Sequence, residues 1–346
     1  MTTARRDVQG LDTLRFVAAV VVALSHGAGP PLAAWLGKDA TWSRLLVGAY
    51  DVSFDGIAAV MVFFVVSGFC IHYAPATGAP FKTLPFWTRR GIRILGPLLG
   101  ALALAASLGP VASVALAAVL WSVYCELIYY ALYPVLRMAF RRFGVPRVLL
   151  VSCLISAAMI GLDWKARYYG DFSIAVMWLL AAPAWLLGCL LAEQVAAGAA
   201  AHDGGRIWVW RAGTWIYAVL ATVVFFHTPI KVGYPLLLFP FYFIAFGWVR
   251  AEIAHFTAAK PSAVLEWCGQ WSYSLYLMHN IAIAITPISV SAPGQSWAIR
   301  LGLIAAGSLG FYALIEAPSH WLARTASRRL LRALSPGAPA PSLASP

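Results

Sequence analysis

The stretch LDTLRFVAAVVVALSH, residues 11–26, decides the fold, because an apolar run that begins beside Asp12 also carries Arg15 and His26. At about 100° per residue, a helix returns these two to within about 20° of the same face, roughly 16 Å apart along its axis. Ionisable residues inside a membrane span are costly and by default mark a site or a pathway. The competing interpretation is that Arg15 snorkels to the inner headgroups and His26 hydrogen-bonds near the outer interface.

The rest of the chain has the composition of a membrane protein. Hydrophobic residues make up 61% of it and charged residues 11%, and its mean hydropathy is +0.77, whereas a soluble domain carries about 25% charge. The net charge of +12 comes from basic residues in short clusters between apolar runs, which favours membrane topology over nucleic-acid binding. The five cysteines form no CxxC pair, so neither a disulfide framework nor a metal site is predicted.

Apolar runs of about the length that crosses a bilayer predict about ten transmembrane helices. They lie at residues 14–34, 57–76, 94–112, 114–136, 147–163, 174–195, 213–228, 232–249, 273–291 and 298–317. The predicted fold is therefore an all-α polytopic membrane protein, with its helices in one bundle around a central cavity. We expect a single transmembrane domain over residues 1–334 and a disordered cytoplasmic tail over 335–346, which is rich in Pro, Ala and Ser.

Orientation follows from the loops, because Lys and Arg collect on the cytoplasmic side of a membrane. When successive loops are assigned to alternate sides, most basic residues share the side of the two termini, which is therefore cytoplasmic. Residues 94–136 barely suffice for two crossings with a turn near Gly109 and Pro110. A re-entrant hairpin over this stretch is the alternative, and it keeps the same side assignments.

Three further segments place polar residues at bilayer depth. MVFFVVSGFCIHY, residues 61–73, holds Ser67 and Gly68 in its interior, where a small pair lets a helix or a ligand approach closely. FWTRRGIRILGP, residues 86–97, sets Arg90 and Arg93 on one helix face. Such a pair suits a phosphate-bearing ligand, although ordinary positive-inside anchoring also explains it.

LWSVYCELIYYALYP, residues 120–134, sets Glu126 in mid-span among aromatic residues that include Trp121 and Tyr130. An unpaired carboxylate there is expensive, so we expect it to face the interior of the bundle. Two later segments carry weaker signals, because their polar residues are equally suited to caps or interface anchors. They are WSYSLYLMHN, with Tyr276 and His279, and FYALIEAP, with Glu316.

Taken together, these segments resemble the acyltransferase-3 family of bacterial integral membrane O-acyltransferases. The matching elements, in the family's order, are Arg15 with His26, FFVVSGF, the Arg90 and Arg93 pair, WSVYCELIYYALYP, YSLYLMH, and Glu316 with Pro318. The resemblance implies a multi-pass protein of the bacterial inner membrane. It also implies an acyl-CoA donor, usually acetyl-CoA, presented from the cytoplasm as a co-substrate with no permanently bound cofactor. The implied acceptor is a hydroxyl on a glycan, a lipid-linked sugar or a natural product, and Arg15 and His26 are implied to be essential.

Our hypothesis assigns roles within this scheme. His26 acts as general base on the acceptor hydroxyl, since imidazole titrates near neutrality, and Glu126 orients it or stabilises the imidazolium. Arg15 is the third expected catalytic residue, and it also assists at the coenzyme A phosphates. The expected donor-binding residues are Arg90, Arg93, Ser67, Gly68 and Trp121. The expected acceptor-side or supporting residues are Tyr130, Tyr276, His279 and Glu316.

The main rival function is a transporter or flippase, because intramembrane Arg, His and Glu equally suit a proton relay or a substrate path. A membrane sensor or scaffold without turnover is a second rival. The acceptor, the acyl chain length, an acyl-His26 intermediate and the oligomeric state are not encoded in these patterns.

Overall fold

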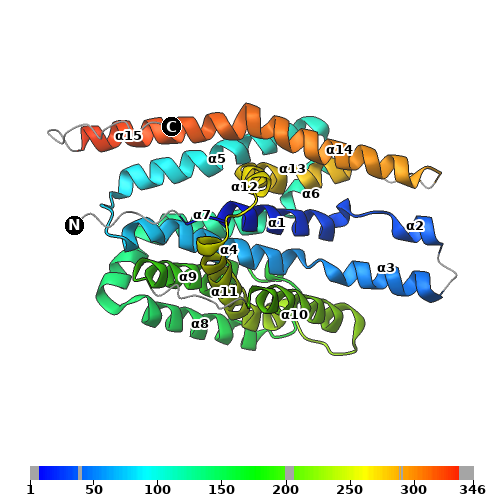
Figure 1. Ribbon diagram of the computed structural model, residues 1–346, viewed down its shortest axis with the longest axis horizontal. Coiled ribbons are helices and arrows are strands. Elements are labelled where there is room, and N and C mark those ends of the chain that lie inside the picture. The colour runs from blue at the N-terminus through cyan, green and yellow to red at the C-terminus, as the bar shows by residue number, and fades with distance from the viewer. Residues whose placement is uncertain (1–7, 38–40, 199–205, 288, 290, 335–346) are drawn as a thin grey trace.

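The computed structural model describes residues 8–37, 41–198, 206–287, 289 and 291–334, and these residues form helices with no β-strand among them. The predicted tail, 335–346, lies outside the described residues. The first half of the chain contains α1 (Leu11–Ala23), η1 (Leu24–Ala28), α2 (Leu32–Leu36), α3 (Thr41–Ser53), α4 (Gly56–Ala76), α5 (Thr83–Leu108), α6 (Pro110–Ala117), α7 (Leu120–Phe143) and α8 (Val145–Leu162). The second half contains η2 (Tyr169–Asp171), α9 (Met177–Ala196), α10 (Ile207–His227), α11 (Tyr234–Ala258), α12 (Ala263–Gln270), α13 (Ser272–Ile285), α14 (Pro293–Phe311), η3 (Tyr312–Glu316) and α15 (Ala317–Ala333). Most helices run along the long axis of the molecule, whereas α12 is viewed nearly end-on (Figure 1).

The predicted all-helical, multi-pass fold is confirmed. Among the described residues, eight helical segments are long and apolar enough to cross a membrane, or nine when α6 and α7 count together as one span. The predicted segment 273–291 corresponds to α13, which has 14 residues and is shorter than the roughly 20 that cross a bilayer. Large apolar side chains are exposed around the bundle, with Leu162 at 88% and Leu314 at 76%, as expected of a surface that faces lipid.

The stretch that includes residues 94–136 folds as two unequal legs. α5 is a 26-residue helix that is long and apolar enough to cross a membrane by itself. Gly109, with a φ of 105°, makes the predicted turn, and Pro110 begins α6. α6 and α7 are bent by 51° at their break, so the second leg is either a broken span or a re-entrant segment. The two alternatives from the sequence, two crossings or a re-entrant hairpin, concerned the whole of residues 94–136.

The start of α1 is fixed by a carboxylate from a distant part of the chain. Glu266, on α12, accepts hydrogen bonds from the backbone N–H of Thr13 at 2.9 Å and from its hydroxyl at 2.6 Å. The first N–H groups of a helix have no partner within the helix, and a negative charge there is favourable. A Cβ at Gly269 would lie 2.2 Å from the carbonyl oxygen of Asp12, so α12 packs directly on α1. These contacts set the position of the helix that carries Arg15 and His26.

α4 and α9 form the most extensive helix pair of the core. A Cβ at Gly68 would lie 1.9 Å from the carbonyl oxygen of Trp185, and a Cβ at Gly188 would lie 2.0 Å from that of Val65. Small residues that allow such close backbone approach are typical of helix packing in membranes. α4 is thereby held at the centre of the bundle, between α9, α1 and α11.

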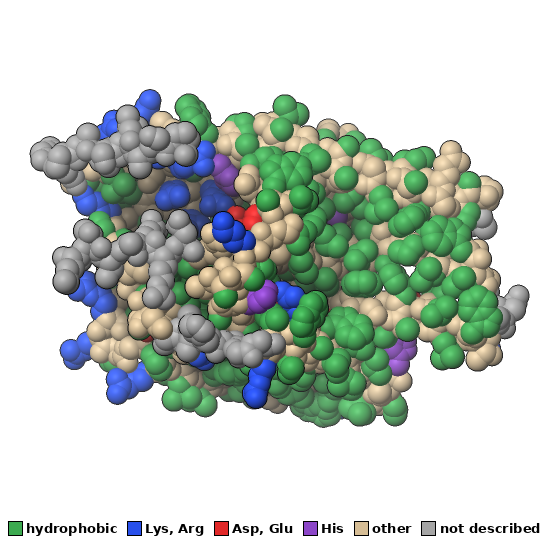
Figure 2. Space-filling view, viewed as in Figure 1, with side chains coloured by type: hydrophobic (Ala, Val, Ile, Leu, Met, Phe, Trp, Pro, Cys, Tyr) green, Lys and Arg blue, Asp and Glu red, His purple; other side chains and the backbone are tan. Residues whose placement is uncertain are grey.

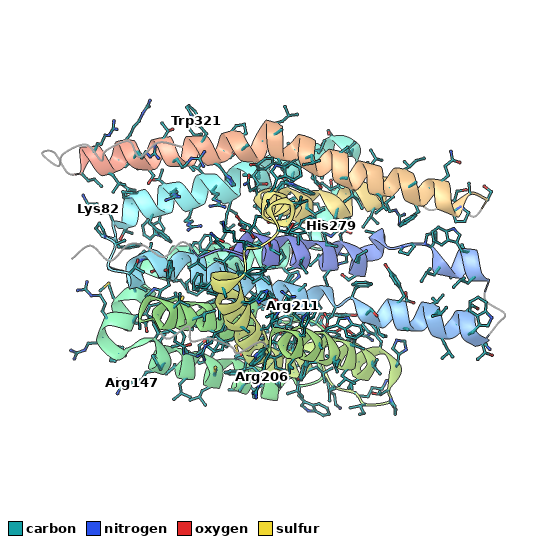
Figure 3. The ribbon with its side chains drawn as sticks, in the orientation of Figure 1. Lys82, Arg147, Arg206, Arg211, His279 and Trp321 are labelled. Carbon is teal, nitrogen blue, oxygen red and sulfur yellow. The ribbon has the colours of Figure 1, made fainter. Side chains whose placement is uncertain are left out.

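Basic side chains gather at one end of the molecule. Figure 2 shows Lys and Arg side chains mainly at this end and a broad hydrophobic surface over the remainder. Lys82, at the start of α5, and Arg147, on α8, lie at this same end (Figure 3). The sequence assigned both residues to the cytoplasmic side.

Candidate functional site

A cavity of about 380 Å³ lies between α1, α4, α5, α7, α13 and the η3–α15 segment. Eight of the residues singled out from the sequence line it: Arg15, Ser67, Arg90, Arg93, Glu126, Tyr130, Tyr276 and Glu316. We call it the inner cavity. Figure 2 shows Lys and Arg side chains in a hollow near the basic end of the molecule, beside acidic and histidine side chains.

Three arginines line the inner cavity, together with the carboxylates of Asp12, Glu126, Glu266 and Glu316. Arg15 makes an ion pair with Asp12 at 3.4 Å. Arg90 lies over the ring of Tyr130, 5.8 Å from its centroid, and neither Arg90 nor Arg93 makes a hydrogen bond or an ion pair within the described part of the chain. Guanidinium groups with free N–H donors in a cavity are suited to phosphate oxygens, which they bind bidentately.

Glu126 is held on one wall of this cavity by donors from two helices. It accepts a hydrogen bond from the Ser67 hydroxyl at 2.6 Å and another from the hydroxyl of Tyr130, one turn along α7. The Ser67 oxygen also receives the indole N–H of Trp185, at 3.3 Å. The half-buried carboxylate is therefore hydrogen-bonded to neutral donors.

Glu316 sits on the opposite wall, at the end of the π-helical turn η3. It accepts hydrogen bonds from the Ser274 backbone N–H at 3.0 Å and the Ser274 hydroxyl at 2.5 Å. His320, one turn further on, also lines the cavity, with its Nε2 3.5 Å from Glu316 Oε1 and without a hydrogen-bond partner. π-helical turns inside α-helices occur frequently at functional sites.

His26 meets His279 rather than a carboxylate. Nδ1 of His26 lies 3.0 Å from Nε2 of His279, and the two rings are stacked with their centroids 5.2 Å apart. His26 lies in η1, which like η3 is a π-helical turn. Its side chain is exposed, whereas His279, on α13, is completely buried. His279 lies nearer the middle of the bundle than Lys82 and Arg147 (Figure 3).

The hydrogen bonds of the pair define its tautomers when both rings are neutral. Nδ1 of His279 lies 3.2 Å from the carbonyl oxygen of Leu275, which only accepts, so Nδ1 carries the proton. A neutral imidazole has one N–H donor, so Nε2 of His279 is an acceptor and Nδ1–H of His26 donates to it. The lone pair of His26 is then on Nε2, the nitrogen that remains available for a reaction.

Tyr276 stands between the inner cavity and the histidine pair. It lines the cavity, and its ring centroid lies 5.9 Å from that of His279. Its hydroxyl donates to the carbonyl of Val119 at 2.9 Å and lies 2.7 Å from the Ser122 hydroxyl. His26 and His279 do not line the inner cavity.

The structure separates some residues that the sequence interpretation grouped together. Glu126 was expected to orient His26, but its hydrogen bonds join it to Ser67 and Tyr130 on the inner cavity, and the partner of His26 is His279. Gly68 and Trp121 were expected at the donor site, yet neither lines the cavity. Gly68 packs on α9 and Trp121 stacks on Tyr169, with ring centroids 5.3 Å apart.

A second cavity, of about 310 Å³, lies beside the other end of the α1–η1 helix. We call it the outer cavity. Ser25 and Gly27, the two neighbours of His26 in the chain, line it together with Tyr50, Asp51 and Phe54. The Tyr50 hydroxyl is buried without a hydrogen-bond partner, and Asp51 makes no ion pair in the part of the chain that the structure describes.

Sequence reasoning missed several polar residues at these sites. His320 follows Glu316 by one helical turn, so the spacing that was applied to other pairs would have found it. Arg300 was not singled out from the sequence, although it lies within the run 298–317 that was predicted to span the membrane. Tyr50 and Asp51 gave no signal, because they lie in a segment that was interpreted as a loop. Among the described residues, no group of three His, Cys, Asp or Glu side chains is placed to hold a metal ion.

The family of the chain follows from its sequence as a whole. Residues 8–316 match the family model of the acyltransferase-3 family, which is described as an acyltransferase domain. Neither the curated proteins nor the solved structures provide a match to the chain. The matched region covers most of the chain and contains the histidine pair, the outer cavity and every residue that lines the inner cavity except His320. The protein therefore belongs to the acyltransferase-3 family and is a multi-pass membrane acyltransferase.

Proposed function

We propose that the protein transfers an acyl group, acetyl in the simplest case, from cytoplasmic acyl-CoA to a hydroxyl group on the other side of the bacterial inner membrane. The acceptor class is a carbohydrate, a lipid-linked sugar or a related natural product. The observation that carries this proposal is the His26–His279 contact, which leaves one basic nitrogen of His26 available. The two chain neighbours of His26 line the outer cavity, and the inner cavity presents Arg90 and Arg93 without ion-pair partners among the described residues.

The donor binds in the inner cavity. Arg90 and Arg93, assisted by Arg15, bind the phosphates of coenzyme A, because they line this cavity and make no hydrogen bond or ion pair among the described residues. Acyl-CoA is a co-substrate in this scheme, not a resident cofactor. The pantetheine arm then extends along the cavity toward Tyr276 and Phe63, whose rings pack edge to face with centroids 6.0 Å apart. A shift of these two rings opens the way to the histidine pair.

The chemical step uses His26 as general base. Its Nε2 takes the proton of the acceptor hydroxyl while the hydroxyl oxygen attacks the thioester carbonyl carbon. The carbon–sulfur bond breaks, and the proton passes from His26 to the departing coenzyme A thiolate. His279 orients His26 through Nδ1, which is the part that a carboxylate plays in a Ser-His-Asp triad. Glu126 instead shapes the donor cavity, because it holds Tyr130 beneath Arg90.

The acceptor enters by the outer cavity. The buried hydroxyl of Tyr50 and the carboxylate of Asp51 supply a donor and an acceptor for hydroxyl groups. Phe54, whose ring packs against that of Tyr50 with centroids 5.2 Å apart, adds an aromatic face. A few polar groups set in an otherwise apolar pocket are typical of small-molecule sites.

Mixing the purified protein with acetyl-CoA tests this function. We expect slow release of free coenzyme A with water as acyl acceptor, and faster release when a hydroxyl-bearing acceptor is added. A transporter, a flippase or a sensor would leave the thioester intact. Intact acetyl-CoA after prolonged incubation with folded protein would refute the proposal. Deletion of the gene, followed by mass spectrometry of surface glycans and secreted metabolites, would identify the acceptor by its lost acyl mass.

A further inference from the structure

Arg300, on α14, is a buried cation without a carboxylate partner. Its side chain is only 8% exposed, and within the described part of the chain it makes no ion pair. Its guanidinium donates to two backbone carbonyls. Nη1 donates to Gly27 O at 2.8 Å, while Nε and Nη2 donate to Thr286 O at 3.0 and 2.5 Å.

These two carbonyls belong to the helix ends that carry the histidine pair. Gly27 directly follows His26 and has a φ of 99°, which breaks the helix inside η1. Thr286 is the C-cap residue of α13, the helix that carries His279. One guanidinium therefore joins the end of the His26 helix to the end of the His279 helix.

The chemistry of helix ends explains why an arginine fits here. The last carbonyls of a helix have no partner within it and carry partial negative charge, which a cation complements. The planar guanidinium offers five donors in a fixed fork, so it can serve two carbonyls from different helices, which the ammonium group of lysine cannot do in the same geometry. Trp297, one turn earlier on α14, adds a bond from its indole N–H to the carbonyl of Ala28 at 3.0 Å.

We propose that Arg300 is a positioning residue for the transfer reaction, which clamps the two helix ends so that His26 and His279 stay in contact. This inference rests on the proposed function of His26 as general base. Arg300 does not touch the inner cavity, so it acts on the reaction through His26 and His279 and not on donor binding.

The clamp predicts a specific kinetic signature for Arg300→Ala. The probe reaction is release of coenzyme A from acetyl-CoA by the full-length protein in detergent, with water as acceptor. We expect kcat to fall about 100-fold, since a displacement of about 1 Å at a catalytic group costs this much, while KM for acetyl-CoA stays unchanged. Ethylguanidinium in solution should restore a large part of the lost kcat. Arg300→Lys keeps the charge, folds if the alanine variant does not, and should remain slow because it lacks the fork.

Arg211→Ala is the matched control. Arg211 is also a hydrogen-bonded arginine, paired with Glu252 at 2.7 Å. It lies on α10 and makes no hydrogen bond to the helices that carry His26 and His279. We expect this variant to lose thermal stability, to keep its kcat and to show no response to ethylguanidinium.

Three results would overturn the clamp. They are an unchanged kcat in Arg300→Ala and Arg300→Lys, a fall in kcat that Arg211→Ala reproduces at equal loss of thermal stability, or no recovery with ethylguanidinium. A wild-type protein that releases no coenzyme A would instead refute the proposed function, and the clamp with it.

Discussion

The inner cavity and the histidine pair differ in how their polar groups are satisfied. In the inner cavity, Arg90 and Arg93 have no hydrogen-bond or ion-pair partner among the described residues, and the Nε2 of His320 has no hydrogen bond. In the pair, His279 is bonded at both ring nitrogens and His26 at Nδ1, which leaves one reactive nitrogen. A region with free donors is built to receive a ligand, and a region with one free nitrogen is built to react. Substitutions in the inner cavity should therefore change KM for acetyl-CoA, and substitutions in the histidine pair should change kcat.

The largest effect is expected from His26→Ala. Loss of the general base should lower kcat by roughly 10²- to 10⁴-fold without changing KM for acetyl-CoA, as measured by release of coenzyme A. His227→Ala is the control, because His227 is an exposed histidine at the end of α10. Full activity in the His26 variant would contradict the assignment of His26 as the general base.

A smaller loss is expected when the orienting ring is removed. His279→Phe keeps an aromatic ring but gives His26 no acceptor for its Nδ1 proton, so the reactive tautomer is no longer fixed. We expect kcat to fall about 100-fold, with KM unchanged. His279→Gln offers an amide oxygen in the same region and should keep more activity than the phenylalanine variant. A rise in KM with unchanged kcat would instead indicate that His279 takes part in donor binding.

The opposite signature should follow from the double variant Arg90→Ala, Arg93→Ala. Hydrogen bonds to charged groups contribute about 1.5–3 kcal/mol each, so we expect KM for acetyl-CoA to rise at least about tenfold while kcat at saturation is kept. Arg142→Ala, at the basic end of α7 and away from the cavity, is the control for lost surface charge. An unchanged KM in the double variant would reduce the two arginines to topology signals.

The smallest effect on catalysis is expected from Gly68→Ala. The added methyl would meet the carbonyl of Trp185, so the free energy of unfolding should fall by about 1–3 kcal/mol, with KM and kcat little changed in the folded fraction. Gly213→Ala is the matched control, since nothing lies within 4 Å of a Cβ there, and thermal unfolding in detergent measures both. A raised KM for acetyl-CoA without a loss of stability would instead support the role of Gly68 in donor binding that was expected from the sequence.

Much of the architecture could be predicted because lipid leaves few choices for a backbone. Apolar runs must form helices in a bilayer, so most of the helices and the turn at Gly109 and Pro110 could be predicted from the sequence. The same argument placed Arg15 and Glu126 inside the bundle, because charges at that depth are too costly to face lipid. Eight of the predicted site residues line one cavity for this reason.

The pairing of side chains between distant helices could not be predicted. His26 and His279 are separated by most of the chain, and α1 and α13 come into contact only through tertiary packing. Glu126 was the partner expected for His26, and a single sequence contains no register between helices that would have indicated His279 instead. Gly68 was equally ambiguous, because a small residue suits a ligand or a helix; in the structure it packs against α9. The domain boundary at residue 334 stays a prediction.

The central claim is that the donor enters at the basic end and reacts beside the opposite compartment. Sealed vesicles of known orientation test it, because acetyl-CoA is charged and does not cross lipid. When the end with Lys82 and Arg147 faces the acetyl-CoA solution, we expect coenzyme A release that falls at least about tenfold in the Arg90→Ala, Arg93→Ala variant at low donor concentration. Release only when the opposite end faces the donor would contradict the account.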